Sequence, residues 1–395
     1  MHTTPDYQPD PSMTDSLQSL RAVCPLLHTN IYLANCSQGP LTLPVRAAIE
    51  TFLGGWASLG MHWNAWVEEV ERARASFAAL IGAAPEDITV GTSVSQLVSS
   101  LASALATDSA NTRHRVVSSQ VEFPGVAHAW LALRKYGWDV EILPTDEQGL
   151  VSTHTFAEAV DKATTVISVP HVCYAHGALT DLETVVAAAH AVDTLVLVDA
   201  YQSIGTVPID VKASGVDFLV AGTLKYLLGT AGIAFLYVNP ALLARLEPSI
   251  TGWFGRANPY AFDSSQLDYA GSAARFDLGT PPIINAYTAR AGMELVLHTG
   301  VEHIWTQIER LSTLAYELTA RLGLRVLGPQ QGTPKGATTA LDAVSPERAH
   351  WLEEELRKHG VIVAARGRGV RLAPHGFTHE DEIERALSTA SRLLS

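Results

Sequence analysis

The sequence predicts an α/β protein in which a large domain, built on a mostly parallel seven-stranded sheet between helices, is joined to a smaller α+β domain at the C-terminal end. Two observations lead to this fold class. Short apolar runs alternate with segments of helical periodicity between about residues 88 and 240, which is typical of a parallel sheet covered by helices on both faces. The 395-residue chain is also 47% hydrophobic and only 17% charged, so it can bury a sizeable core.

The N-terminal part of the chain precedes the alternating region. Residues 1–20 are polar, acidic and proline-bearing, which predicts a flexible arm. A short strand is expected at Ile31–Leu33, followed by a helix that starts after Pro44 and a second helix that ends at Gly82. We expect the large domain to span 21–290, with its N-terminal segment contributing to the small domain.

The alternating region supplies the strands of the large sheet. Helical spacing occurs between them at 95–106, 126–136, 156–160 and 182–191. The seven expected strands are Ile88–Val90, Arg115–Ser118, Val140–Leu143, Thr165–Val169, Leu195–Val198, Phe218–Val220 and Ile233–Val238.

The rest of the chain predicts the smaller domain, over 291–395. A stretch rich in aromatic residues, glycine and proline at 251–282 comes before it and is too irregular for a helix or a strand. After that stretch we expect one long helix from Ala286 to about Gly323, a helix at Pro346–His359, short strands at Val361–Ala364 and Val370–Leu372, and a last helix from His379.

Composition excludes several classes of function. The net charge of −13 and the absence of basic runs disfavour nucleic-acid binding. No apolar run is long enough to span a membrane, and the N-terminus lacks the apolar core of a signal peptide. Three scattered cysteines, Cys24, Cys36 and Cys173, suit neither a disulfide framework nor a metal site, so we expect a reduced, cytoplasmic enzyme without a bound metal.

Two charged residues stand in apolar surroundings. Lys225 lies between two buried strands, where an ammonium group is costly unless it is neutralised or chemically engaged, and a desolvated lysine suits a Schiff-base nucleophile. Asp199 ends the strand "TLVLVD" at the edge of a parallel sheet where ligands bind. The alternatives are a lysine that reaches solvent from a strand end and an aspartate that caps a helix. Together, a buried amine and a buried acid suit pyridoxal phosphate.

The segment "LVDAYQSIGTVPIDVKASGVDFLVAGTLKYLLGTAGIAFLYV" resembles the core signature of fold-type I pyridoxal-phosphate enzymes of the class V aminotransferase family. The resemblance extends from about residue 30 to 390 and favours the kynureninase-like, C–S lyase-like and isopenicillin-N-epimerase-like branch. A cysteine desulfurase would need a cysteine shortly before Arg371, and none occurs after Cys173. Leu224 also replaces the histidine that desulfurases usually carry there.

The resemblance implies a set of cofactor-binding residues. Lys225 would be the Schiff-base lysine, Asp199 the partner of the pyridine nitrogen and Gln202 the donor to the phenolic oxygen. Phe123 would stack on the ring, with an ordinary core phenylalanine as the alternative. The resemblance also places a group of residues at the phosphate: Ser93, Val94 (through its N–H), Ser95 and Thr223, with Gly279 and Thr280 reaching the phosphate of a neighbouring subunit in a homodimer.

The resemblance also implies an α-amino acid substrate. Arg371 would bind its α-carboxylate, since the planar guanidinium suits bidentate recognition; the alternative is an arginine that reaches solvent. His62, Trp63 and Arg256 are candidates for the border of the pocket, with core packing as the alternative for the tryptophan. Arg256 would suit a distal carboxylate or other anion on the substrate.

The leading functional hypothesis is therefore a lyase that cleaves a C–S or C–C bond at Cβ of an amino acid. An aminotransferase or an amino-acid epimerase or racemase of the same family would use the same Lys225 and Asp199. A nicotinamide-dependent oxidoreductase would fit the alternating layout, but the glycine-rich turn that it needs after its first strand is missing. A non-catalytic binding module would have a degenerate site, whereas Lys225, Asp199, Gln202 and Arg371 are all present.

Overall fold

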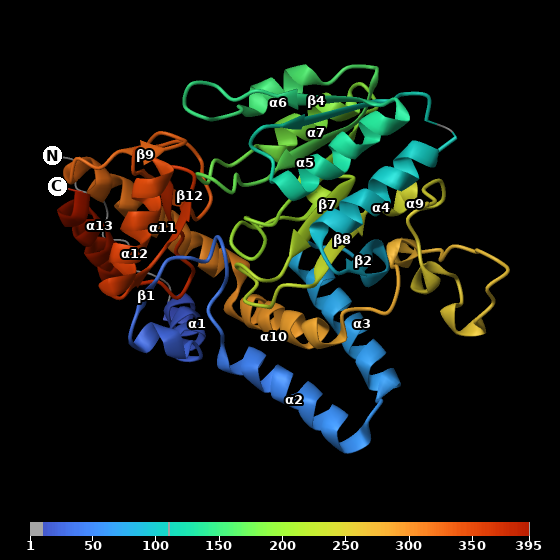
Figure 1. Ribbon diagram of the computed structural model, residues 1–395, viewed down its shortest axis with the longest axis horizontal. Helices are drawn as coiled ribbons and strands as arrows, with labels where there is room; N and C mark the ends of the chain where they lie inside the picture. Colours follow the sequence, from blue (N-terminus) through green and yellow to red (C-terminus); the bar gives the residue numbers. More distant parts are fainter. Residues whose placement is uncertain (1–10, 110, 395) are drawn as a thin grey trace.

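The computed structural model describes residues 11–109 and 111–394 and confirms the α/β fold class (Figure 1). The large sheet has seven strands in the order β2-β8-β7-β6-β5-β3-β4, and β8 alone runs antiparallel to its neighbours. All seven expected strands are present. Their bounds are β2 (Ile88–Gly91), β3 (Arg115–Ser119), β4 (Asp139–Leu143), β5 (Thr164–Pro170), β6 (Leu195–Asp199), β7 (Phe218–Gly222) and β8 (Ala234–Val238).

The two faces of this sheet bury two separate hydrophobic cores. Successive residues of a strand point to opposite faces, so Leu195 and Leu197 belong to one core and Val196 and Val198 to the other. Helices α4 (Val94–Thr107) and α5 (Pro124–Leu131) cover the first face. The second core takes in α3 (Trp63–Leu80), α6 (Thr153–Ala159), α7 (Leu182–His190), α8 (Val211–Ser214) and α10 (Ile283–Thr299).

The C-terminal part of the chain forms an antiparallel sheet of four strands in the order β12-β13-β10-β9. Two distant segments also meet here, because β1 (Ile31–Tyr32) pairs in parallel with β11 (Val361–Ile362). Three helices pack on this unit, which lies at the left of Figure 1. The bounds are β9 (Val326–Leu327), β10 (Thr339–Asp342), β12 (Ala364–Arg366), β13 (Gly369–Leu372), α11 (Val301–Arg321), α12 (Pro346–Lys358) and α13 (Glu380–Leu394).

Two expectations about helices were wrong. The flexible arm expected over 1–20 is instead helical from Pro11, as α1 (Pro11–Ala22), and residues 1–10 lie outside the described part of the chain. Met13, Leu17 and Leu20 are spaced for one helical face and are all buried, which fixes this segment on the core. The single long helix expected after Ala286 is broken at Gly300, whose φ of 87° interrupts the helix between α10 and α11.

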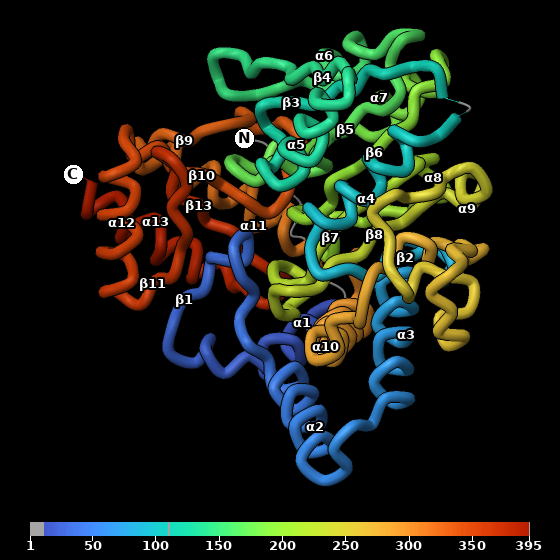
Figure 2. The backbone as a smooth tube through the Cα atoms, turned by 45° about the vertical axis from the view of Figure 1, so that its right-hand side comes forward, coloured from blue at the N-terminus to red at the C-terminus, as the bar shows by residue number. Residues whose placement is uncertain are grey.

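One helical hairpin extends away from the rest of the molecule. It consists of α2 (Leu43–Leu59) and α3, whose connecting turn forms the tip at the bottom of Figure 2. The aromatic stretch at 251–282 has neither strands nor α-helices and contains three short 3-10 helices: η4 (Trp253–Gly255), η5 (Pro259–Ala261) and η6 (Ala273–Phe276). Within the described residues, no helix is both long and apolar enough to cross a membrane.

Candidate active site

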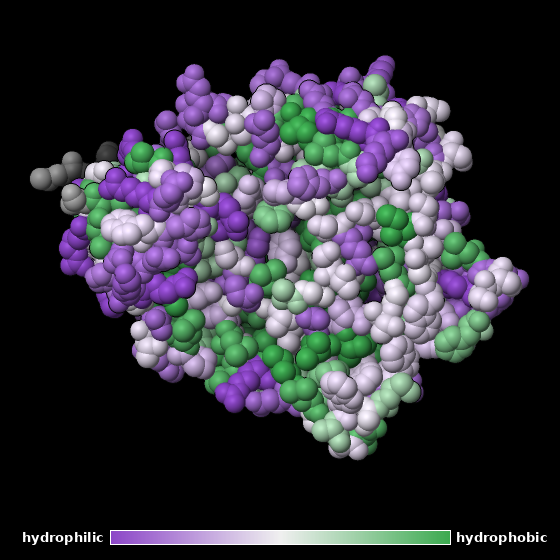
Figure 3. All heavy atoms as spheres, viewed as in Figure 1, coloured by the Kyte–Doolittle hydropathy of each residue, from purple (hydrophilic) through white to green (hydrophobic). Residues whose placement is uncertain are grey.

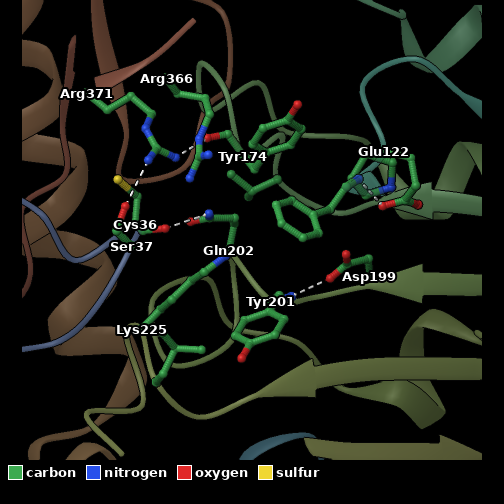
Figure 4. A pocket seen from close by; sticks show the side chains of 14 residues that line it. Cys36, Ser37, Glu122, Tyr174, Asp199, Tyr201, Gln202, Lys225, Arg366 and Arg371 are labelled. Carbon is green, nitrogen blue, oxygen red and sulfur yellow. Dashed lines mark hydrogen bonds between the residues drawn. The ribbon is translucent and has the colours of Figure 1, made fainter. Parts of the chain in front are cut away.

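A cavity of about 270 Å³ opens at the carboxyl ends of β5 and β6 (Figure 4). In open parallel sheets, ligands bind in the crevice outside the carboxyl ends of the strands. The cavity also receives the loop between β7 and β8, the β12–β13 hairpin and the segment after β1. Its lining residues are Cys36, Ser37, Glu122, Phe123, Pro170, Val172, Tyr174, Asp199, Tyr201, Gln202, Leu224, Lys225, Arg366 and Arg371.

Lys225 lies in the loop between β7 and β8, and its side chain forms no hydrogen bond or ion pair with any described residue. Its Nζ atom sits 4.3 Å from the centre of the Tyr201 ring and 5.6 Å from that of Phe123. Burial lowers the pKa of Lys225 to about 8, and the Asp199 carboxylate offsets part of this effect. The amine is thus held among aromatic rings in a form that is partly neutral near physiological pH, as a nucleophile or base requires.

This pKa predicts how the protein without cofactor reacts with an added aldehyde. Only the neutral amine attacks a carbonyl, so the uptake rate of pyridoxal phosphate should rise about tenfold per pH unit up to pH 8 and then level off. The visible absorption band of the bound cofactor, followed in stopped flow across a pH series, gives this rate. A rate that still rises above pH 10 would mean that Lys225 titrates like an ordinary lysine.

Asp199 and Glu122 form a buried pair of acids beside the lysine. Asp199 is the last residue of β6, and its Oδ1 atom accepts a hydrogen bond from the Tyr201 N–H at 2.8 Å. Glu122 accepts one from the Phe123 N–H at 2.8 Å. Burial, followed by repulsion from Asp199, raises the pKa of Glu122 well above its usual range. The positive charge of Lys225 opposes the rise in the pKa of Asp199 that burial causes. We therefore assign one proton to the pair, on Glu122, and the negative charge to Asp199.

Gln202 follows Asp199 by three residues and carries an unsatisfied polar atom. Its Nε2 donates to the Cys36 carbonyl at 2.9 Å, which ties the segment after β1 to the end of β6. Its Oε1 is buried and has no hydrogen-bond partner. A buried polar atom without a hydrogen-bond partner costs about 1–3 kcal/mol of stability. Such an atom beside a cavity therefore indicates that a ligand forms the missing hydrogen bond.

The residues expected at a phosphate gather at the start of α4. The Ser93 hydroxyl accepts a hydrogen bond from the Gln96 N–H and caps the helix, and the side chains of Ser93 and Ser95 are exposed, whereas Val94 is buried. A helix N-terminus favours an anion. The buried Thr223 donates instead to the Thr230 carbonyl at 3.1 Å.

Two further expectations concern exposed residues. Gly279 and Thr280 are exposed and do not line the cavity of their own chain. Phe123 is 42% exposed and its ring meets that of Tyr174 edge-on, so it is not an ordinary core phenylalanine. Its ring instead faces the cavity beside Lys225.

Arg371 lies on β13 and is only 1% exposed. Its Nε donates to the Ala364 carbonyl at 3.3 Å, Nη1 to the Tyr174 carbonyl at 2.8 Å and Nη2 to the Ser37 hydroxyl at 2.9 Å. A guanidinium has five N–H groups, so each terminal nitrogen keeps one N–H free. No carboxylate pairs with this buried cation among the described residues. The arrangement leaves a rigid fork that can bind an incoming carboxylate through both nitrogens.

The structure does not bring three of the predicted residues into this cavity within one chain. Arg256 donates to the Asp268 carboxylate at 2.6 Å and to the Asp263 carbonyl, and it lines other cavities. Trp63 stacks on Trp253, and His62 is an exposed residue at the start of α3. The prediction that Arg256 reads a distal anion on the substrate therefore lacks a free guanidinium in the single chain.

Sequence analysis missed Glu122, Tyr201, Cys36, Tyr174 and Arg366 as members of the site. Glu122 directly precedes Phe123, and an acid next to a predicted cofactor contact could have drawn attention to it. Arg366 lies five residues before Arg371 in "AARGRGVRL", where three arginines compete for the same role. Only the register of the β12–β13 hairpin shows which of these arginines share a face.

A second lysine also has a lowered pKa. Lys335 is partly buried, donates to the Thr339 hydroxyl at 2.5 Å and lies 4.6 Å from the centre of the Tyr316 ring. Burial lowers its pKa to about 7. It lines a separate cavity, so the lowered pKa alone does not distinguish Lys225. Lys225 is distinguished by its neighbours in the cavity, Asp199, Gln202 and Arg371.

Several known proteins are similar to this chain. The family model "Aminotransferase class-V" matches residues 31–380. An uncharacterized aminotransferase of Bacillus subtilis, YcbU, is 37% identical over 370 residues, which cover 94% of this chain and 96% of the relative. The chain belongs to the class V aminotransferase family. It is a pyridoxal-phosphate-dependent enzyme, as the resemblance implied.

Some relatives are more distant. The kynureninase of Pseudomonas fluorescens is 26% identical over 379 residues, 92% of this class V family member and 88% of the kynureninase. Among solved structures, a C-DES variant with glycine covalently linked to its pyridoxal phosphate superposes with a TM-score of 0.84 at 19% identity. The match covers 97% of this chain and 99% of that one and shows a shared fold.

The residues of this family member's cavity fit the cofactor. Asp199 offers a carboxylate for the pyridine nitrogen and Lys225 an unpaired amine for the aldehyde. The Gln202 Nε2 that was expected to donate to the phenolic oxygen donates instead to the Cys36 carbonyl, and the orphaned Oε1 is an acceptor. The exposed hydroxyls at the start of α4 offer donors for the phosphate. These groups leave Arg371 free for the substrate.

Proposed function

We propose that this enzyme is a lyase that cleaves a C–S or C–C bond at Cβ of an α-amino acid. The observation that carries the proposal is the buried Arg371 fork, anchored on three sides and opening toward the same cavity as the unpaired Lys225. Such a fork suits an α-carboxylate and orients the amino acid so that Cα faces the amine. The relatives named kynureninase favour this proposal.

When bound, pyridoxal phosphate supplies an electron-withdrawing ring that stabilises negative charge at Cα. Asp199 would keep the ring nitrogen of the bound cofactor protonated, because a buried carboxylate there favours the positive form. Lys225 takes the proton from Cα as general base, a role suited to an amine whose pKa is about 8. The leaving group then departs from Cβ. No cysteine lies on the β12–β13 hairpin, so persulfide transfer of the desulfurase kind is not part of the proposal.

An aminotransferase is the second candidate, because the relative that is 37% identical is named as one. It would use the same lysine and aspartate but return the proton to the cofactor rather than expel a group from Cβ. An epimerase or racemase would return it to Cα. The three reactions therefore differ in where Lys225 delivers its proton.

Product analysis separates these reactions. We expect the enzyme to release a keto acid and ammonia together from a substrate with a leaving group at Cβ, such as β-chloroalanine, without any added keto-acid acceptor. A coupled lactate dehydrogenase assay follows the keto acid, and ammonia is measured afterwards in quenched samples, so that no 2-oxoglutarate is present during turnover. Turnover that requires an acceptor would identify an aminotransferase, and loss of optical activity without ammonia would identify an epimerase. Either result would overturn the proposed lyase.

We further propose that the enzyme is a homodimer with sites shared between the subunits. Apolar side chains gather on the face over α2, as Figure 3 shows, and Trp56, Leu59 and Met61 are 56%, 62% and 76% exposed. An exposed apolar patch of this kind suits a second copy of the chain. Gly279 and Thr280 are free to reach the phosphate in the partner. His62 and Trp63 stand next to Met61, so we propose that they too act on the partner's pocket.

A further inference from the structure

A second guanidinium enters the candidate active site beside Arg371. In the β12–β13 hairpin, Ala364 pairs with Arg371 and Arg366 pairs with Gly369. Residues two apart on a strand share a face, so Arg366 projects from the same face as Ala364 and is the diagonal neighbour of Arg371. Figure 4 shows both arginines at one end of the cavity, near Tyr174, with Lys225 and Asp199 away from them.

Unlike the other arginines of this hairpin, Arg366 has no partner within the described part of the chain. Arg371 is held by three hydrogen bonds, and Arg368 pairs with the Asp342 carboxylate at 3.4 Å. The Arg366 side chain forms no hydrogen bond or ion pair and is exposed at the cavity. Its guanidinium therefore keeps all of its N–H groups available to a ligand.

The charges that line the cavity do not balance. Arg366, Arg371 and Lys225 are basic, whereas Asp199 and Glu122 share one proton and supply one negative charge between them. An α-carboxylate satisfies Arg371, and the cofactor engages Lys225 and Asp199. One positive charge, on Arg366, is then left without a counterpart. A complementary substrate would bring a second negative charge to it.

The geometry points to a substrate with two anionic groups: we propose that Arg366 binds a carboxylate, sulfinate or sulfonate on the side chain of the amino acid, while Arg371 binds the α-carboxylate. This inference rests on the proposed function and adds the class of substrate. It moves the recognition of a distal anion from Arg256, which is already paired, to Arg366. Arg366 is then a specificity-determining residue rather than a catalytic one.

The test measures binding of matched pairs of amino acids to the enzyme with its cofactor. L-Aspartate and L-glutamate carry the second anion, and L-asparagine and L-glutamine have nearly the same shape without it. Titration of the visible cofactor band gives a dissociation constant for each, independently of turnover. We expect the acidic member of each pair to bind at least tenfold more tightly in the wild-type enzyme, with the preference falling as salt rises.

The variant Arg366→Met keeps the aliphatic length and removes the charge. It should weaken binding of the acidic amino acids about 10- to 100-fold and leave the amides unchanged. Arg368→Met is the matched control on the same hairpin and should change neither. Equal weakening of acids and amides would mean that Arg366 shares the α-carboxylate with Arg371, and no change would mean that it is only solvated; both outcomes overturn the inference.

Failure of the inference is distinguishable from failure of the proposed function. If the enzyme eliminates a group from Cβ but shows no preference for acidic amino acids, only the role of Arg366 is wrong. If it prefers acidic amino acids but needs a keto-acid acceptor, the lyase reaction is wrong and the substrate class stands. Retention of the cofactor band in Arg366→Met shows that the variant is folded.

Discussion

Replacing Lys225 by alanine is expected to reduce turnover by about 10³- to 10⁴-fold or more, the largest loss of any single substitution in this protein. In the proposed reaction, Lys225 both holds the cofactor and takes the Cα proton, so the variant would lose both functions. Steady-state release of keto acid and ammonia, measured with saturating pyridoxal phosphate, checks this result. Saturation with the cofactor separates the loss of the base from a loss of cofactor.

Lys335→Ala is the matched control for this experiment. Lys335 is also a partly buried lysine with a lowered pKa, but it lines a different cavity that lacks the acid pair and the arginines. Its replacement should leave turnover within about twofold of wild type, since it touches none of the groups that the reaction uses. A loss in Lys335→Ala equal to that in Lys225→Ala would contradict the assignment of the lysine.

Replacing Asp199 by asparagine is expected to lower kcat by about 10²- to 10³-fold while the cofactor stays bound through Lys225. The amide keeps the shape of the side chain and can still accept the hydrogen bond from the Tyr201 N–H. It removes the negative charge that we propose keeps the ring nitrogen protonated. The measurement is kcat together with the cofactor band of the variant.

Glu122→Gln is the control that isolates the charge of Asp199. Glu122 is assigned as the protonated member of the pair, so a neutral amide in its place should change kcat by less than about tenfold. If Glu122→Gln were as damaging as Asp199→Asn, the negative charge would not reside on Asp199. Near-wild-type activity of Asp199→Asn would contradict the role of the aspartate altogether.

The parallel sheet could be predicted from the sequence because its strands are buried on both faces. Such strands appear as continuous apolar runs, and all seven were found, including "TLVLVD" with Asp199 at its end. Lys225 stood out for the same reason, because a charge within an apolar run has few explanations, whereas Arg371 was identified through the family resemblance. Burial thus makes both the sheet and its exceptions visible in a single sequence.

The predictions from the sequence were wrong where tertiary contacts, rather than the local sequence, determine the structure. Helix α1 is too polar on average to look structured, but three spaced apolar residues, Met13, Leu17 and Leu20, pack it on the core, and its Arg21 pairs with the Glu382 carboxylate. Gly300 breaks a helix whose two halves are each periodic. Arg256 looked free because Asp268, its partner, lies twelve residues along an irregular loop. Arg366 looked like a loop residue until the hairpin register placed it beside Arg371.

We propose that Lys225 holds pyridoxal phosphate in the cavity that Asp199 and Arg371 also line. Reduction of the enzyme and its cofactor with borohydride, followed by peptide mass spectrometry, tests it most directly. We predict that the pyridoxyl phosphate adduct is found on Lys225 at one equivalent per chain. An adduct on Lys335 or another lysine with Lys225 unmodified, or a protein that takes up no cofactor, would contradict the account.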